Sequence, residues 1–461
     1  MFQGAYECYK NVCCACAAAH NGLVQKVSVP PSAGREERNP PSMSDVVDRF
    51  IKYCAVPSQS NPLTADRVPS TESQFDIAKV IADDLRELGA EDVVVTENAY
   101  VTAHWPASEG CEDLPTLGFC CHIDTAWQSY GDPVHPQIKR YEGGKLTIGT
   151  GRDGKEVFIS PETNACLERM VGWDLVTADG TSLLGGDDKA GDAMVVSLLA
   201  RLKDDPSLPH PRLAVSFVPD EEIGHGAALL DLDEFGATFG YTIDGGPLGE
   251  FCYETFNAAE AKVRAKGLSV HTGTAKGIMV NACEAIMKFH ALVPPQERPE
   301  YTENYDGFYY LERIQGDCEE ALADYIIRDH DQAKVEARKE TMRKAVDFVN
   351  QTFGQEVLTI EIHDQYHNLA DVVTKPEYSH LIENARAAYA KIGQEMTCIP
   401  MRGGTDGSQL SFRGFACGNL SACYYNAHGV REFVPVPELE AMVDMLQELV
   451  ALYAKPQVSV G

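Results

Sequence analysis

The chain has 461 residues and a formal net charge of −30, with 44% hydrophobic and 23% charged residues. This length predicts more than one domain, and the composition is ordinary for a globular protein. The acidic excess argues against nucleic acid and anionic membrane surfaces as partners, because both require basic protein surface. No apolar run reaches the roughly eighteen residues that a membrane-spanning helix needs, so none is expected.

The 15 cysteines lie mostly within apolar runs, as Cys120, Cys121 and Cys252 do. An odd number of cysteines in apolar surroundings is typical of reduced, buried thiols and not of a disulfide framework. The cysteines therefore predict a cytoplasmic protein.

Residues 1–42 differ in character from the rest of the chain. They contain four prolines in two pairs and a charged, polar run without periodicity. We expect a disordered N-terminal extension, with the folded protein beginning at Met43.

From Met43 the pattern alternates between helices and strands. Helical spacing of apolar residues predicts helices over 46–54, over 75–88 with an end at Gly89, and over 189–203. Short apolar runs predict buried strands at 93–96, 116–121, 212–218 and 240–243, and residues 143–160 predict a hairpin. This alternation predicts an α/β fold around a mostly parallel sheet.

Ligand-type side chains follow four of the apolar runs, and one more stands at a predicted helix start. These residues are His122, the pair Glu221 and Glu222, Asp244, His428 and, before the helix, Asp187. Open α/β sheets bind ligands beyond the carboxyl ends of their strands. Each residue alone has an ordinary explanation as a turn former, a solvated charge or a structural hydrogen-bonding group. Together they predict a metal centre in which Asp187 bridges two ions.

The residue types indicate which metals and which chemistry to expect. Two histidines among carboxylates suit Zn²⁺, Mn²⁺ or Co²⁺ better than Mg²⁺ or Ca²⁺. Asp124 lies on the same side of the extended segment as His122, where it can orient the imidazole. Hydrolysis also needs a carboxylate that is free to move a proton, and the spacing leaves open whether Glu221 or Glu222 has that role.

Several ordered motifs resemble the peptidase T family of tripeptide aminopeptidases, within the dinuclear-zinc exopeptidase superfamily. The matching segments are residues 122–125, 184–191, 219–224, 241–246, 270–277, 279–282, 306–309, 325–329, 402–412 and 426–429. The resemblance extends from Met43 to about Lys455. The sequence departs from the family pattern at Gly186, Thr272, Ala427 and Arg431, none of which is a predicted ligand.

The resemblance implies a role for each site residue. His122, Asp187 and Asp244 would hold one zinc, and Asp187, Glu222 and His428 the other, giving two Zn²⁺ per subunit, with Co²⁺ or Mn²⁺ as alternatives. Asp124 would be the catalytic aspartate and Glu221 the proton shuttle. His271, Asn281 and Arg402 would bind substrate, the arginine as a planar fork for a peptide carboxylate.

The resemblance also implies a catalytic α/β domain interrupted by an α+β lid that pairs two subunits into a homodimer. We expect the catalytic domain at 43–253 and 371–461 and the lid at 254–370. Within the lid, the pattern predicts strands at 261–265, 325–328 and 356–363, and helices at 278–292 and 332–351.

The function implied is a metallo-aminopeptidase that hydrolyses the N-terminal peptide bond of tripeptides. Two alternatives stay open. One is an amidohydrolase or dipeptidase of the same superfamily that acts on another small peptide or N-acyl substrate. The other is a non-catalytic peptide-binding protein on this fold, although such a protein need not retain a full ligand set together with Glu221.

Overall fold

The computed structural model describes residues 45–455, which divide into two compact units. Unit 1 contains residues 45–253, 372–399 and 413–455, and unit 2 contains residues 254–371 and 400–412. The chain therefore returns to unit 2 at 400–412, a segment that the sequence analysis placed in the catalytic domain. The predicted disordered extension, residues 1–42, lies outside the described residues.

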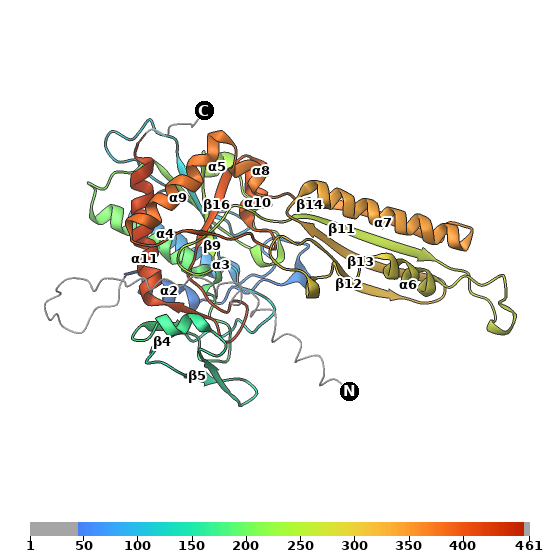
Figure 1. Ribbon diagram of the computed structural model, residues 1–461. Helices are drawn as coiled ribbons and strands as arrows, with labels where there is room; N and C mark the ends of the chain where they lie inside the picture. Colours follow the sequence, from blue (N-terminus) through green and yellow to red (C-terminus); the bar gives the residue numbers. More distant parts are fainter. Residues whose placement is uncertain (1–44, 456–461) are drawn as a thin grey trace. The chain divides into compact units, whose positions relative to one another are not determined.

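Unit 1 is built on an eight-stranded mixed sheet (Figure 1). In spatial order the strands are β1 (Glu91–Val95), β2 (Val101–Trp105), β8 (Leu213–Val218), β3 (Leu117–His122), β9 (Phe239–Gly245), β16 (Ala416–Ser421), β10 (Glu250–Cys252) and β15 (Thr397–Cys398). The four neighbours β8, β3, β9 and β16 run parallel, whereas β1, β2 and β10 pair antiparallel with their neighbours towards the middle of the sheet. Every residue of β3, β8 and β16 is buried, as expected for strands covered on both faces. The predicted α/β class is confirmed.

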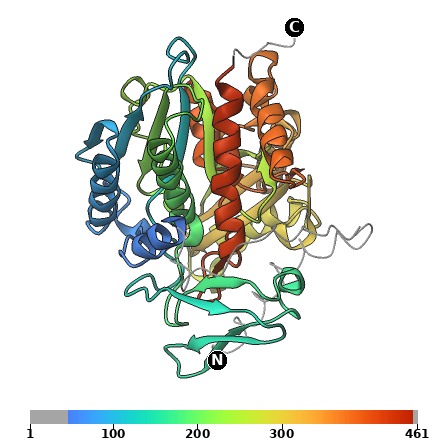
Figure 2. The same ribbon diagram turned by 90° about the vertical axis from the view of Figure 1, so that its left-hand side faces the viewer.

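Five longer helices belong to unit 1. They are α2 (Asp45–Cys54), α3 (Gln74–Leu88), α4 (Gly186–Asp204), α9 (Ser379–Lys391) and α11 (Val436–Tyr453). Helix α4 is buried almost throughout because it contacts β3 and β9 on one side and α2 and α11 on the other; Figure 2 shows α4 and α11 side by side. Helix α3 ends at Gly89 as predicted, because glycine there adopts a left-handed conformation (φ 96°).

Smaller elements complete the description of unit 1. A three-stranded sheet contains β17 (Phe433–Pro435), β7 (Asp174–Thr177) and β4 (Gln137–Arg140), and β5 (Leu146–Thr150) pairs with β6 (Glu156–Ile159) as the predicted hairpin. The short helix α5 (Leu232–Phe235) also belongs to this unit. Among residues 45–455, no helix has the length and apolar character that crossing a membrane requires.

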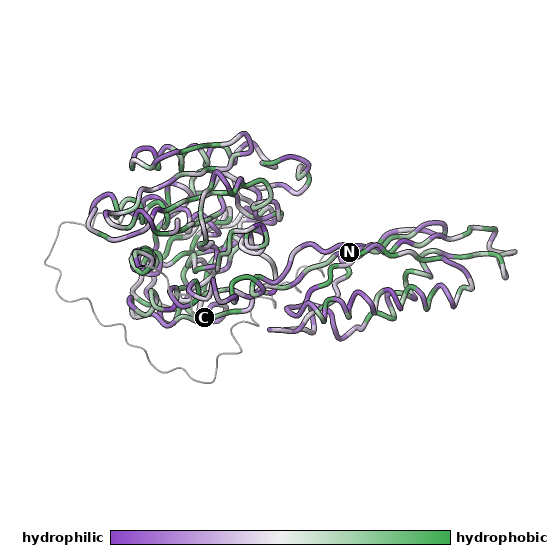
Figure 3. Tube along the Cα trace, turned by 90° about the horizontal axis from the view of Figure 1, so that it is seen from above, coloured by the Kyte–Doolittle hydropathy of each residue, from purple (hydrophilic) through white to green (hydrophobic). Residues whose placement is uncertain are grey.

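Unit 2 is an antiparallel sheet with two helices packed on it. The strand order is β12 (Phe308–Gly316), β13 (Glu320–Asp329), β11 (Asn257–Lys266) and β14 (Leu358–Tyr366). Along β11, buried Ala259, Ala261 and Val263 alternate with charged residues. Figure 3 shows hydrophilic and hydrophobic residues interspersed along the trace. Helices α6 (Ala282–Leu292) and α7 (Gln332–Phe353) contribute to the same hydrophobic core as these buried residues. Two short helices, α8 (Ala370–Val373) and α10 (Asp406–Arg413), lie where the chain passes between the units.

Candidate metal centre

The four parallel strands of unit 1 bring the candidate ligands to one edge of the sheet. His122 is the last residue of β3, Asp244 lies near the end of β9, and Glu221 and Glu222 form a short turn after β8. His428 follows β16. Because parallel strands share the direction of their carboxyl ends, these side chains converge although they are far apart in sequence.

Asp187 lies between the two histidines. Its Oδ1 is 2.9 Å from His122 Nε2, and its Oδ2 is 3.1 Å from His428 Nε2. Asp187 lies in the first residues assigned to α4, but its backbone is not helical (φ −82°, ψ 104°), so the carboxylate is presented before the regular helix begins. A carboxylate with one oxygen towards each histidine has the geometry that a bridging ligand needs.

Two further carboxylates complete the surroundings of the histidines. Asp244 Oδ1 is 3.7 Å from His122 Nε2, and Glu222 Oε2 is 3.1 Å from His428 Nε2. One nitrogen or oxygen from each of His122, Asp187 and Glu222 lies within 4.8 Å of the others. The five predicted ligands therefore lie close together, and their division into two sets stays a prediction.

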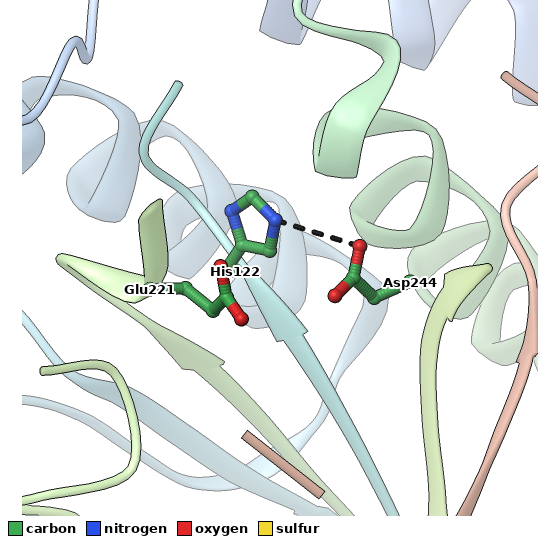
Figure 4. A group of neighbouring side chains, drawn as sticks. All are labelled: His122, Glu221 and Asp244. Carbon is green, nitrogen blue, oxygen red and sulfur yellow. Dashed lines mark ion pairs between the residues drawn. The ribbon is translucent and has the colours of Figure 1, made fainter. Parts of the chain in front are cut away.

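Glu221 approaches the centre from the side of the first set. A carboxylate oxygen of Glu221, a carboxylate oxygen of Asp244 and a ring nitrogen of His122 all lie within 4.8 Å of one another. Figure 4 shows the carboxylates of Glu221 and Asp244 directed towards the His122 ring. Glu221 is half-buried, so it is accessible to a small molecule. Its neighbour Glu222 turns instead towards His428.

Asp124 is fully buried beside these residues and holds them in two ways. The Nδ1 atom of His122 is 3.1 Å from the backbone oxygen of Asp124 and 3.4 Å from its Oδ1, which leaves Nε2 directed at Asp187. The Asp124 carboxylate also accepts the backbone N–H groups of Glu221 (3.0 Å) and Glu222 (3.2 Å). Asp124 therefore orients both the histidine and the glutamate turn.

Burial and the neighbouring charges shift the pKa values of the residues in the centre. Burial, followed by repulsion from Asp187, raises the pKa of Glu222 to about 7 and that of Asp244 to about 6. Burial alone would lower the pKa of His428, but hydrogen bonds to Asp187 and Glu222 raise it to about 11. Burial would raise the pKa of Asp187, yet the two histidines outweigh it and keep this pKa well below its usual value.

The donor set fits divalent metal ions. The Oε1 atom of Glu222 is buried and has no hydrogen-bond partner, so the cluster contains an unused acceptor as well as mutually repelling carboxylates. A bound cation would give the unused oxygen a partner and would reduce the repulsion between the carboxylates. Imidazole nitrogens mixed with carboxylate oxygens suit Zn²⁺ and related transition-metal ions.

Comparisons with known proteins agree with this geometry. The family model described as peptidase family M20/M25/M40 matches residues 176–452. Peptidase T of Alkaliphilus oremlandii is 40% identical over 415 residues, covering 90% of this chain and 100% of that protein. The chain belongs to peptidase family M20/M25/M40. Peptidase T of Bacillus subtilis is likewise 40% identical, over 88% of this chain and 97% of that protein.

Solved structures of the M20 family share the fold. Aminopeptidase PepT from Bacillus cereus superposes with a TM-score of 0.70 at 23% identity, covering 89% of this chain and 98% of that one. The Bacillus subtilis YXEP protein, a dinuclear metal binding peptidase from the M20 family, superposes with a TM-score of 0.59 at 14% identity, covering 88% and 97%. At these identities the likeness supports the fold of this M20 chain, and the site rests on its own residues.

The three predicted substrate-binding residues all belong to unit 2. His271 is exposed and its Nδ1 accepts the Gly273 N–H (3.2 Å), while Asn281 caps the start of α6. Arg402 donates from Nη1 to the backbone oxygens of Asn304 (3.0 Å) and Asp306 (2.7 Å) and from Nη2 to Thr302 Oγ1 (2.8 Å). Much of the donor capacity of Arg402 is thus used within unit 2.

Asn419 and Asp220 are among the residues that hold the candidate ligands in place and that sequence reasoning missed. Asn419 accepts the Asp244 N–H (3.0 Å) and donates to the Asp244 backbone oxygen (3.0 Å). Asp220 accepts from Ser70 and from Gln74 Nε2 (2.6 Å), which ties the segment before Glu221 to the start of α3. Asn419 could have been noticed as a polar residue inside an otherwise apolar run. For Asp220 the only indication in the sequence was its place next to Glu221.

Metal affinity should rise with pH between about 6 and about 8, because metal ligands must be deprotonated. The raised pKa values of Glu222, Asp244 and His428 mean that the metal-free centre holds protons at neutral pH, and a cation must displace them. Raising the pH removes part of this competition. Calorimetric zinc titrations in two buffers of different ionisation enthalpy should show proton release, and Glu222→Gln should release fewer protons. An affinity that is independent of pH would contradict this assignment.

Proposed function

We propose that this M20 chain is a metallo-aminopeptidase that hydrolyses the N-terminal peptide bond of tripeptides. The observation that carries the proposal is Asp187 standing between His122 and His428, with Asp244 and Glu222 beside them. The relatives named peptidase T, about 40% identical over nearly their whole length, support the reaction class and the substrate class.

The proposed cofactors are two Zn²⁺ per subunit, with Co²⁺ or Mn²⁺ as alternatives. His122, Asp187 and Asp244 would hold one ion, and Asp187, Glu222 and His428 the other. When bound, such a pair of ions supplies polarisation of the scissile carbonyl and a lowered pKa of water. The support in this chain is the mixed nitrogen and oxygen donor set and the unpartnered Oε1 of Glu222.

Glu221 is the proposed proton shuttle. Its carboxylate accepts a proton from the attacking water and then donates a proton to the leaving amine nitrogen. Two observations support these separate roles: Glu222 is within hydrogen-bond distance of His428, whereas the Glu221 carboxylate lies within 4.8 Å of His122 and Asp244. Asp124 keeps the proton shuttle in position through the backbone N–H groups of Glu221 and Glu222.

The decisive assay compares matched peptides. Zinc-loaded protein should cleave a tripeptide with a free N-terminus faster than the corresponding dipeptide and tetrapeptide, and should not cleave the N-acetylated tripeptide. Removing the metal with a chelator should abolish cleavage, and added zinc should restore it. Preference for the acetylated peptide or for the dipeptide would instead support an amidohydrolase or a dipeptidase. Binding without cleavage would support a non-catalytic peptide-binding protein.

His271, Asn281 and Arg402 remain proposed substrate-binding residues. Arg402 has fewer N–H groups left for a peptide carboxylate, because its Nη1 and Nη2 already donate to residues 302–306. Replacing Arg402 by lysine should therefore lower the stability of unit 2 as well as any affinity for a peptide carboxylate. A raised KM with an unchanged melting temperature would indicate direct substrate contact.

A homodimer that pairs through unit 2 is also proposed. Among the described residues, ten of the 17 exposed large hydrophobic side chains belong to unit 2, the smaller unit. Two of them, Tyr310 and Ile314, lie on β12, an edge strand of the sheet. Exposed edge strands pair readily with another chain.

Light scattering should give about twice the 50.4 kDa mass of one chain. Ile314→Lys should shift the equilibrium towards monomer. Val171→Lys, at a residue of similar exposure in unit 1 (54% against 52%), should leave the dimer intact. A monomeric mass for the unaltered protein would refute the proposal.

The proposed location is the cytoplasm. All eleven cysteines among residues 45–455 are free thiols, and most of them are buried. Reduced cysteines of this kind are typical of proteins in a reducing compartment. Fractionation of cells that express the tagged full chain tests the proposal, and recovery from a secreted fraction would contradict it.

A further inference from the structure

Glu432 is a buried glutamate that the reaction proposed above does not use. It is 1% exposed, and its carboxylate accepts three backbone N–H groups from a single loop. Oε2 accepts from Leu184 (2.9 Å) and Gly185 (2.8 Å), and Oε1 accepts from Asp187 (3.1 Å). A carboxylate that accepts several backbone N–H groups holds the loop that donates them firmly, since each charge-assisted bond is stronger than a neutral one.

The loop that Glu432 holds is the one that presents Asp187. This loop needs an external support because Gly185 is in the left-handed region (φ 82°) and Asp187 is not helical, so the regular bonds of α4 do not fix it. The contact is also close: a Cβ atom on Gly186 would lie 3.0 Å from Oε1 of Glu432. The carboxylate therefore fits directly against the backbone of the loop.

Glu432 also belongs to the turn that carries His428. Its own N–H donates to the Gly429 oxygen (3.1 Å), and the Asn426 side chain donates to the Arg431 oxygen (3.1 Å), which closes the turn between them. One side chain thus joins the two loops from which Asp187 and His428 extend. Across this connection, Asp187 Oδ2 and His428 Nε2 are 3.1 Å apart.

We infer that Glu432 is a positioning residue that sets the spacing of Asp187 and His428 and, through it, the affinity of the metal site formed with Glu222. The inference rests on the metal centre proposed above. Glu432 acts on the site through the backbone, because its oxygens accept backbone N–H groups, that of Asp187 among them.

The first metal site should depend less on Glu432. His122 is held at Nδ1 by Asp124, which lies outside the loop that Glu432 holds, and its N–H donates to Asp188 Oδ2 (3.2 Å). Asp244 is held by Asn419. Of the residues in the first set, Glu432 supports only Asp187. In the second set it supports both Asp187 and the turn that carries His428. Loss of Glu432 should therefore weaken the second site more than the first.

Glu432→Gln in the full chain tests the inference, because glutamine keeps the shape but places an NH₂ group against backbone N–H donors. Metal-free protein would be titrated with zinc by calorimetry, and its zinc content measured after dialysis at fixed free zinc. The unaltered protein should bind two ions per chain. The variant should keep one tight site while the other weakens by about 10- to 100-fold, the usual effect of losing a residue that supports metal ligands.

Asp329→Asn is the matched control. Asp329 is an equally buried carboxylate (1% exposed) that accepts the Asp331 N–H and an Arg338 bond, but it lies in unit 2. It should lower the melting temperature of the metal-free protein without changing either zinc affinity. If Glu432→Gln does not fold, Glu432→Asp, which keeps the charge but shortens the reach, takes its place.

The outcomes are distinguishable. Selective weakening of one site supports the inference, whereas unchanged affinities, or equal weakening of both sites, overturn it. If the unaltered protein binds fewer than two ions, the proposed dinuclear centre fails, and the role of Glu432 within it fails with it.

Discussion

Glu221→Gln should lower kcat by about 10²- to 10⁴-fold, the usual contribution of general acid–base catalysis, while zinc content stays unchanged. Glutamine is nearly isosteric with glutamate but cannot accept the proton of the attacking water. Because the shuttle acts mainly in the transition state, KM should change far less than kcat. Steady-state kinetics on a tripeptide, paired with elemental analysis of the same sample, measure both quantities.

Glu222→Gln is the matched control for this prediction, since the two glutamates are adjacent and both donate a backbone N–H to Asp124. Glu222 is close to His428 and its pKa is raised by burial and by Asp187, as expected of a ligand in a crowded anionic site. This variant should lose zinc, and excess zinc should restore part of its activity. If instead Glu221→Gln loses zinc and Glu222→Gln keeps it, the two roles are reversed.

Much of unit 1 could be predicted because its strands are buried. The runs at 116–121 and 212–218 are apolar almost throughout, and the structure has β3 and β8 within a residue of those bounds. The ligand residues were recognisable for the same reason: a charged side chain directly after a fully buried strand needs a partner. The convergence followed from the rule that open α/β sheets bind ligands beyond the carboxyl ends of their strands, whereas the neighbour order β8, β3, β9 and β16 that produces it could not be read from one sequence.

Strands β12, β4 and β7 are among the elements that the sequence analysis missed. Strand β12 is mostly exposed along its length, so its residues lack the alternation that marks a half-buried strand. Strands β4 and β7 are four residues each and pair only with distant segments. Residues 400–412 belong to unit 2 because of tertiary contacts, such as the hydrogen bond from the Phe256 N–H to the Gly403 oxygen. Such contacts between distant segments cannot be predicted from the local sequence pattern.

The supporting hydrogen bonds were hardest to predict. Glu432 reaches back to the loop before Asp187, at a sequence separation of 248 for Leu184. Nothing in its neighbourhood distinguishes it from a solvated surface glutamate, yet it is nearly inaccessible. Ligand residues can be inferred from their residue types and their places after predicted strands. The residues that position them can be recognised only from the folded structure.

Asp187→Asn should remove both metal ions and with them all measurable peptidase activity. Asparagine retains the shape of the side chain but loses its charge. Its amide nitrogen cannot act as the second ligand oxygen, so the altered side chain cannot face both histidines as an acceptor. By contrast, His428→Ala removes a contact of only one set and should empty mainly that site. Zinc content after dialysis, measured for the two variants in parallel, gives this comparison directly.

Asp231→Asn serves as the control for charge removal, because Asp231 caps α5 in the same unit and asparagine is an equally good cap. It should bind zinc and cleave peptides as the unaltered protein does. The metal-free Asp187→Asn protein should melt at a lower temperature than the metal-free parent, because His122 and His428, which hold the pKa of Asp187 well below its usual value, lose their anionic partner. Retention of both zinc ions by a folded Asp187→Asn protein would exclude the bridging role of Asp187.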